Sequence, residues 1–493
     1  MPVARTGRVA GPGTATRSRA AAGVAERVAS AASAAGQSRV GRVIVRTLRT
    51  GAPGFEHWLA RLEDRGEEQA GSVEGAVRAI LDQVRRGGDR ALRACTRRLD
   101  GVDVPPRALA VDRGAMEAAF ATLPRVQRAA LRLAARRIRD YHRHQLETSF
   151  RFRDRVGVVL GQEIRPLRRV GLYVPGGAAL YPSSVLMNAI PARVAGVAEV
   201  VAVTPPHPGG EPAALLAAGF VANVDTIFRA GGAQAIAALT WGTATVARVD
   251  KIVGPGNRYV ATAKKLVAGR VGIDMIAGPS EVVVIADASA RADLIAADLL
   301  AQAEHGPDST AICLTPSVRL AAAVERALAV QLAELPRAAL ARRSLRDHGT
   351  LVVTRDVAEA VEIANRLAPE HLELAVAEPR RWLAQIRAAG AVFLGHASPE
   401  AFGDYLAGPN HVLPTGGTAR FASPLGVYDF LKRTSVIEAS PAALRRLGPT
   451  VATLAAMEGL DAHGRAVTRR LTPPAGAAPA TPPRVRLRRN RRS

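Results

Sequence analysis

Cysteine is almost absent from this sequence of 493 residues, which contains only Cys95 and Cys313. So few cysteines exclude a disulfide framework and favour a reducing compartment, and we therefore expect a cytoplasmic protein. Cys95 lies in a helical pattern and Cys313 in a strand-like one, so both are predicted to be core residues rather than nucleophiles. The sequence also lacks any apolar run of about eighteen residues, which predicts no membrane-spanning helix and no membrane partner.

Lysine is scarce as well. Arginine therefore supplies nearly all of the basic charge behind a formal net charge of +24. A strong positive charge can indicate a nucleic-acid partner. Here, however, residues 1–43 contain seven Arg and one Glu, and residues 471–493 contain six Arg and no acidic residue, so these two tails hold half of the excess. No helix-turn-helix, zinc finger or aromatic-rich RNA-binding sheet is recognisable between them. We therefore expect no nucleic-acid partner.

Neither tail has the apolar periodicity that a folded element needs. Residues 1–43 show no sustained pattern, and residues 471–493 are rich in Pro and Arg, so both tails are predicted to be disordered. The first tail contains Arg and Ser and hardly any acidic residue, as an organelle transit peptide would. We favour the simpler interpretation, an extended bacterial start, and keep the transit peptide as an alternative.

Between the tails the sequence alternates short β-branched runs with helical spacing, which predicts an α/β fold. Residues 71–101 and 116–147 have the apolar spacing of amphipathic helices, the first with a break at Gly87-Gly88. Strand, turn, helix and strand in succession indicate parallel sheets with crossover helices. Two such series occur and predict two doubly wound domains. The expected strands begin near residues 169, 199, 224 and 248 in the first series, and near 281, 310 and 349 in the second.

Two glycine-rich turns follow expected strands and lead into helices, at residues 230–232 and 254–257. Backbone N–H groups at a helix start bind phosphate, so this arrangement favours a nucleotide ligand. Neither turn is a GxGxxG fingerprint. The residues alone therefore leave open whether these are ligand sites or plain turns.

Polar residues cluster at four points in the second half of the chain. Gln302 and His305 share a helix face at spacing i, i+3, and Glu370 and His371 are adjacent. Two His, one Asp and one Gln would suit zinc or manganese, but each residue taken alone is more often an ordinary cap or surface residue, so spacing alone does not establish a metal site. The four points are Gln302 with His305, Glu370 with His371, Asp404 with His411, and Glu458 with His463.

Long motifs in one order resemble the histidinol dehydrogenase family from about residue 43 to residue 471. They include "GLYVPGG", "GGAQAIAAL", "DKIVGPGNRYV", "LLAQAEHGPDS", "APEHLEL", "GDYLAGPNHV" and "EGLDAHGRAV". The resemblance implies two incomplete Rossmann-like doubly wound domains, one inserted in the other, and a small helical C-terminal part. We expect residues 44–170 and 281–425 to form the first domain, residues 171–280 the inserted nucleotide-binding domain, and residues 426–470 a part exchanged between the subunits of a homodimer.

The resemblance also implies an activity, the last step of histidine biosynthesis. L-Histidinol would be oxidised to L-histidine through L-histidinaldehyde, in two NAD-dependent steps and with one zinc ion per site. Glu370 would activate water and His371 would act as general base. By motif position, the zinc ligands would be Gln302, His305, Asp404 and His463. The substrate would contact these four residues together with Ser280, His371, His411 and Glu458, and NAD would contact Tyr173, Gln234 and Asn257.

Three other interpretations are kept. A related dehydrogenase could oxidise another small alcohol, such as a sulfonated diol, although the complete set of matched residues argues against it. A zinc hydrolase would work without NAD. A nucleic-acid-binding protein would depend on its basic tails.

Overall fold

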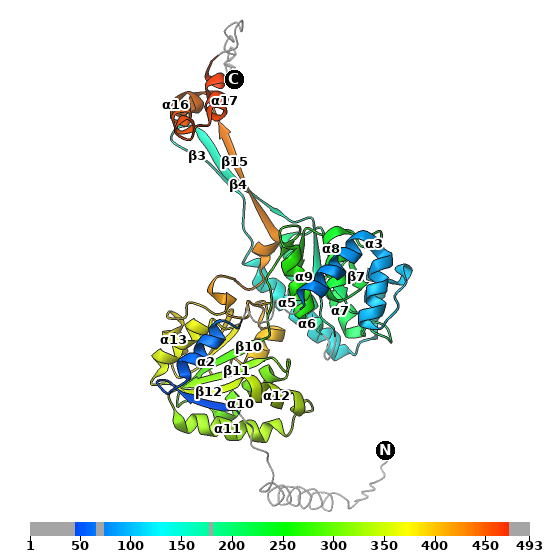
Figure 1. Cartoon of the computed structure of the whole chain (residues 1–493), viewed down its shortest axis with the longest axis vertical. Helices are drawn as coiled ribbons and strands as arrows, with labels where there is room; N and C mark the ends of the chain where they lie inside the picture. The colour runs from blue at the N-terminus through cyan, green and yellow to red at the C-terminus, as the bar shows by residue number, and fades with distance from the viewer. Residues whose placement is uncertain (1–44, 66–72, 177–180, 473–493) are drawn as a thin grey trace, which may run out of the picture.

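The computed structural model of the chain describes residues 45–65, 73–176 and 181–472. The two tails that were predicted to be disordered therefore lie almost entirely outside the described residues. Leu471, which was counted with the second tail, is the last residue of helix α17 (Asp461–Leu471). Two parallel sheets with helices on both faces make up the body of the molecule, which confirms the expected fold class (Figure 1).

The first sheet is entirely parallel and has the strand order β1-β12-β11-β10-β13-β14. From β10 the chain proceeds outward to β12 and then returns to the other side at β13, so the sheet is doubly wound with a switch point between β10 and β13. Every residue of β10 and β11 is buried, because helices cover both faces of the sheet. The strands are β1 (Arg46–Arg49), β10 (Glu281–Ala286), β11 (Thr310–Thr315), β12 (Gly349–Val353), β13 (His371–Ala375) and β14 (Ala391–Leu394).

Helices from two parts of the chain cover this sheet. One face packs on α10 (Ala292–Ala303), α11 (Val318–Leu332) and α12 (Ala338–His348). The other packs on α2 (Phe55–Glu63) and α13 (Val357–Leu367), with Trp382 of α14 (Pro379–Leu383) at its edge. The N-terminal segment with β1 and α2 thus joins elements more than 200 residues away.

The second sheet repeats this topology, in the order β2-β7-β6-β5-β8-β9. All its pairings are parallel except that of β2 with β7. Its switch point lies between β5 and β8. The strands are β2 (Ala110–Val111), β5 (Arg169–Tyr173), β6 (Glu199–Thr204), β7 (Thr226–Arg229), β8 (Lys251–Val253) and β9 (Gly272–Ile273). The helices on its faces are α3 (Glu74–Asp100), α8 (Gly232–Trp241) and α9 (Arg258–Val267) on one, and α4 (Arg113–Thr122), α5 (Arg125–Arg143), α6 (Pro182–Ala195) and α7 (Ala213–Val221) on the other.

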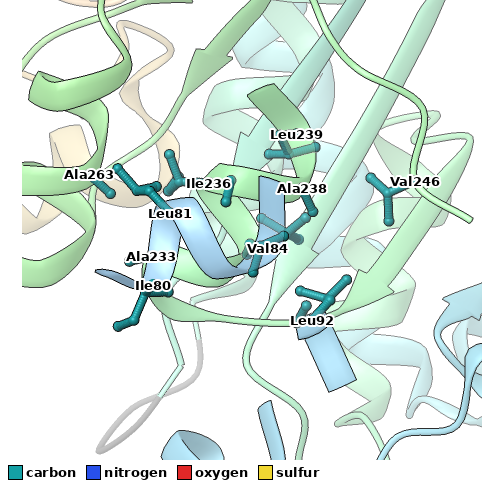
Figure 2. Close-up of a cluster of buried hydrophobic side chains, with 14 of the residues drawn as sticks. Ile80, Leu81, Val84, Leu92, Ala233, Ile236, Ala238, Leu239, Val246 and Ala263 are labelled. Atoms are coloured by element: carbon teal, nitrogen blue, oxygen red, sulfur yellow. The ribbon is translucent and has the colours of Figure 1, made fainter. Parts of the chain in front are cut away.

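The long helices before the second sheet pack on that sheet and not on the first. Figure 2 shows Leu81 and Val84 of α3 beside Ile236 and Leu239 of α8, in one buried apolar cluster. An amphipathic helix must bury its apolar stripe, and for α3, α4 and α5 the second sheet and its helices supply the partner surface. In this packing α3, α4 and α5 lie on the second sheet, whereas the expected boundary at residue 171 grouped them with the first domain.

A narrow antiparallel arm projects from this body, and a helix pair forms its tip (Figure 1). Strand β4 (Val158–Pro166) pairs with β3 (Phe150–Arg153) on one side and with β15 (Leu431–Ala439) on the other. The helices at the tip, α16 (Pro441–Met457) and α17, pack on each other and stand clear of both parallel sheets. The expected C-terminal part is therefore anchored to residues 158–166 and carried away from the body.

Both cysteines are buried, Cys95 in α3 and Cys313 in β11, as predicted for core residues. Burial raises the pKa of the Cys313 thiol to about 12, so it stays protonated. Among the described helices, none is long and apolar enough to cross a membrane.

Candidate active site

A cleft of about 2280 Å³ lies between the two parallel sheets. One sheet faces it with the carboxyl ends of its strands and the other with the amino ends. The second sheet presents the carboxyl ends of its strands, since Tyr173 ends β5 and Gly254 follows β8. The first sheet presents its amino ends, because Glu281 and His371 are the first residues of β10 and β13. Ligands of doubly wound sheets bind beyond the carboxyl ends at a switch point, so the second sheet offers the side for a nucleotide.

The Glu370-His371 pair lies at the switch point of the first sheet and is almost completely buried. Ala368 just before it has a positive φ of 45°, a conformation that non-glycine residues rarely adopt and that costs roughly 1–2 kcal/mol. The Glu370 carboxylate accepts hydrogen bonds from the Ser280 hydroxyl at 2.7 Å and from the Glu281 backbone N–H at 2.9 Å. The fold thus holds Glu370 against the start of β10.

The imidazole of His371 is oriented from the same strand. Its Nδ1 lies 3.2 Å from the backbone oxygen of Glu281, which fixes Nδ1 as the donor because a carbonyl oxygen only accepts. Its Nε2 then carries a lone pair and lies 3.8 Å from Oδ1 of Asp404. Burial lowers the pKa of His371 to about 3, so the ring is neutral at neutral pH.

Three acidic or imidazole side chains come together beside His371, and one of them was not predicted. The candidate ligand atoms of His305, Glu400 and Asp404 lie within 4.8 Å of one another. Asp404 lies in a short π-helical turn, Gly403–Ala407. Burial raises the pKa of Asp404 to about 6 in the absence of a bound cation.

Gln302 supports a metal site at this place. Its side chain is fully buried at the end of α10, one helical turn before His305. Neither its amide oxygen nor its amide nitrogen has a hydrogen-bond partner among the described residues. A buried amide without partners costs roughly 1–3 kcal/mol, a cost that a coordinated cation would remove from the oxygen. Gln302 is buried, Asp404 is half-buried and His305 is exposed, and together they have the chemistry of the predicted N/O ligand set.

Ser280 and His411 lie in the same part of the cleft, next to Glu370 and Asp404 respectively. The Nδ1 atom of His411 lies 3.0 Å from the backbone oxygen of Asp404, and its Nε2 lies 3.5 Å from the Ser184 hydroxyl. Burial lowers the pKa of His411 to about 4, which keeps it neutral. Both His411 and Ser280 line the cleft, as expected for residues that contact a substrate.

On the opposite wall, the three residues predicted to contact the cofactor lie at or beyond the carboxyl ends of strands of the second sheet, with Gln234 in the first turn of α8. Tyr173 accepts a hydrogen bond from the Gly232 N–H at 3.0 Å. Asn257 is the N-cap of α9, and its side-chain oxygen accepts from two backbone N–H groups of the first turn. Gly254 has φ +106°, and a Cβ there would lie 2.3 Å from the backbone oxygen of Tyr173, so this turn requires glycine. Tyr173, Gln234 and Asn257 all line the cleft.

Glu458 and His463 are the two predicted residues that the structure does not bring to the cleft of their own chain. Both are exposed in the helix pair at the tip of the arm, far from either sheet (Figure 1). The motif interpretation assigned them to a partner's site, and this arrangement leaves that assignment as a prediction.

Two cleft-region residues were missed by the sequence interpretation. Glu400 is buried, and its Oε1 lies 3.6 Å from Nδ1 of His371. Its spacing of four residues before Asp404 is a signal of a shared helix face that could have indicated it. Asp100 ends α3 and accepts a hydrogen bond from the Gln234 amide at 2.9 Å. No pattern in the sequence marks this contact, since 134 residues separate the two.

Comparisons with known proteins agree with these features. The family model for histidinol dehydrogenase matches residues 63–471. A histidinol dehydrogenase of Syntrophotalea carbinolica is 55% identical over 413 residues, which cover 84% of this chain and 96% of that protein. One from Geobacter metallireducens is 54% identical over 424 residues, covering 85% and 96%. The crystal structure of histidinol dehydrogenase from Elizabethkingia anophelis is similar with a TM-score of 0.81 at 35% identity, covering 87% of this chain and 98% of that one. The chain therefore belongs to the histidinol dehydrogenase family of oxidoreductases.

Proposed function

We propose that the chain oxidises L-histidinol to L-histidine through L-histidinaldehyde, with zinc and NAD, as the last step of histidine biosynthesis. The observation that carries this proposal is the buried Glu370-His371 pair, whose base nitrogen faces the ligand set of Asp404 and His305. Two neighbouring residues that can each accept a proton suit two successive oxidations at one place. The expected cytoplasmic location stays a prediction that goes with this role.

The metal is proposed from the residues that would hold it. Gln302, His305 and Asp404 are the ligands offered by one chain, and the unpartnered amide of Gln302 fits such a role. When bound, the zinc ion would grip the nitrogen atoms of the substrate, and NAD would accept a hydride in each oxidation. Tyr173, Gln234 and Asn257 would contact NAD beyond the carboxyl ends of the second sheet.

His371 would remove the hydroxyl proton of L-histidinol in the first oxidation. Its Nδ1–H is held by the Glu281 carbonyl, so Nε2 is the atom that takes the proton while the carbon–hydrogen bond is broken. The aldehyde carbon then has to gain a water oxygen. Glu370 would take a proton from that water, which gives the hydrate that the second oxidation consumes.

The environment of Glu370 matches this role. Burial raises the pKa of its carboxyl well above the usual range, and the Ser280 hydroxyl and the Glu281 N–H oppose this rise. A carboxylate with a raised pKa is a stronger base toward water than an exposed one. Since Glu370 and His371 are adjacent, the aldehyde need not leave between the two steps.

We further propose a homodimer with shared active sites. The helix pair at the arm's tip carries Glu458 and His463, and apolar side chains are exposed on it and along the arm. Exposed apolar side chains in such a number favour contact with another protein surface. Insertion into the partner's cleft would supply His463 as the fourth zinc ligand and Glu458 as a contact for the substrate's amino group. The exposed apolar residues are Phe150, Phe152, Ile437, Leu447, Val451, Leu454, Met457 and Leu460.

An assay of NADH absorbance on purified protein tests this function. With L-histidinol and NAD, we expect NADH formation that stops after a zinc chelator is added and returns with zinc. A sulfonated propanediol at the same concentration should give no turnover. Turnover of the diol but not of L-histidinol, or hydrolysis without NAD, would replace the proposal by one of the other interpretations.

A further inference from the structure

The side chain of Gln234 is fully buried, yet only one of its two polar atoms makes a hydrogen bond among the described residues. Its amide nitrogen donates to Oδ2 of Asp100 at 2.9 Å. Its amide oxygen has no hydrogen-bond partner among the described residues. Gln234 lines the cleft beside Gly232, and a Cβ at Gly232 would lie 2.6 Å from that oxygen. The oxygen therefore faces a place that glycine keeps free of side chain.

Asp100 determines which end of the amide faces which way. An ionised carboxylate only accepts hydrogen bonds, so the NH₂ group of Gln234 must face Asp100 and the carbonyl oxygen must face away. If the amide turned over, two acceptor oxygens would meet in a buried place at a cost of several kcal/mol. Asp100 is the last residue of α3, which packs on α8, and α8 carries Gln234 in its first turn. Both partners are thus held by rigid helices.

We propose that Asp100 is a positioning residue of the cofactor site, which aims the Gln234 carbonyl oxygen at a hydrogen-bond donor of the bound dinucleotide. This inference rests on the proposed NAD dependence and adds the chemistry of the contact. The ligand group must be a donor, since a phosphate or carbonyl oxygen would meet an acceptor. A dinucleotide offers three kinds of such donors, the ribose hydroxyls, the amino group of adenine and the carboxamide N–H of the nicotinamide.

The substitution Asp100→Asn tests the inference with hardly any change of shape. An asparagine can present either its oxygen or its nitrogen, so the Gln234 amide loses its enforced orientation. We expect NAD binding, measured by titration calorimetry, to weaken about ten-fold. We also expect the KM for NAD to rise by a similar factor, with a far smaller fall in kcat at saturating NAD. A substitution that only loosened the fold would instead change the melting temperature and the KM for both substrates.

A swapped pair gives the decisive rescue. Gln234→Glu alone places two carboxylates against each other and should bind NAD at least as weakly as Asp100→Asn. In the double variant D100N/Q234E, the introduced asparagine donates to the introduced glutamate, whose second oxygen again faces the ligand as an acceptor. We expect NAD affinity within about three-fold of the unaltered protein. The matched control is Asp103→Asn, because Asp103 lies just after the end of α3, is exposed and pairs with Arg93, so its substitution should leave NAD affinity unchanged.

An acetylpyridine analogue of NAD, which lacks only the carboxamide N–H, distinguishes that donor from the others. If the donor is a ribose hydroxyl or the adenine amino group, Asp100→Asn should weaken binding of the analogue as much as it weakens binding of NAD. If it is the carboxamide, the substitution should have no effect on the analogue. Unchanged NAD affinity in Asp100→Asn, or no rescue in the double variant, would overturn the inference. Failure of the unaltered protein to bind NAD would instead overturn the proposed function.

Discussion

At the scale of single residues, the role proposed for each buried polar group depends on which of its atoms already makes a hydrogen bond within the protein and which is free. His371 has one nitrogen held by a backbone carbonyl and the other free, and Glu370 has one oxygen shared by two donors. The sequence identified these residues only through long motifs, because a lone His or Glu gives no sign of burial. Glu400 and Asp100 lie outside those predictions, since only the fold brings them to their partners.

His371→Asn should abolish NADH formation from L-histidinol, because the amide cannot take the hydroxyl proton. It retains a donor for the Glu281 carbonyl, so zinc content measured by atomic absorption should stay at the level of the unaltered protein. His396→Asn is a matched control, since His396 is exposed and should leave turnover unchanged. Normal turnover by His371→Asn would refute the assignment of the base.

Glu370→Gln separates the two half-reactions. Water must be activated only in the conversion of L-histidinaldehyde to L-histidine, so this half should slow at least about 100-fold while the alcohol half slows much less. Single-turnover measurements that start from each substrate give the two rates. An equal loss in both halves would count against the hydration role of Glu370.

Glu373 should make stability depend on pH in a direction that is unusual for a carboxylate. Burial and the neighbouring Asp298 raise its pKa to about 9, above the ordinary value of 4.5. The folded state thus favours the protonated form, and its contribution is fully present below pH 4.5 and is lost as the pH rises toward 9. Denaturant unfolding should therefore show a free energy of unfolding that falls over this window by at least about 1 kcal/mol more than in Glu373→Gln. Parallel pH curves for the two proteins would contradict this.

At the scale of elements, the sequence predicted most strands and helices of the two parallel sheets. Buried parallel strands are continuous β-branched runs, and their helices have regular apolar spacing, so both signals are local. The break at Gly87-Gly88 is seen as non-helical backbone at Gly88 inside α3. The arm was not predicted, because β15 pairs with residues more than 250 positions earlier and its exposed strands lack an alternating pattern.

The turn after β8 depends on a buried ion pair. Lys264 of α9 contacts the Asp274 carboxylate and donates to the Gly254 carbonyl at 3.0 Å, while the Gly254 N–H donates to Asp274 at 2.7 Å. Lys264→Met would leave a buried carboxylate unpaired, and it should lower the free energy of unfolding by about 3–5 kcal/mol.

The neighbouring Lys265 is exposed, so Lys265→Met should change that free energy by less than about 0.5 kcal/mol. Denaturant titration of both variants checks the pair. Equal stabilities of the two variants would show that the ion pair does not hold the turn.

At the scale of the whole molecule, His305 and Asp404 line the cleft of one chain and Gln302 lies buried one helical turn before His305, whereas Glu458 and His463 lie at the tip of the arm. The proposed active site is therefore built from residues of two subunits. The expected boundary at residue 171 did not anticipate that α3, α4 and α5 pack on the second sheet, because helix periodicity shows that a helix is amphipathic but not which sheet covers it. The same reasoning applies to the arm, whose partner surface no local pattern specifies.

The most direct test of this account mixes two inactive variants and measures NADH formation from L-histidinol. His371→Asn lacks the base of its own cleft, and His463→Ala lacks the ligand that would enter the partner's cleft. After subunit exchange, half of the dimers should contain one of each chain and therefore one intact site, which predicts recovery of about a quarter of the activity of the unaltered protein. No recovery, with exchange verified by mass spectrometry of the mixed dimer, would contradict a shared active site that oxidises L-histidinol.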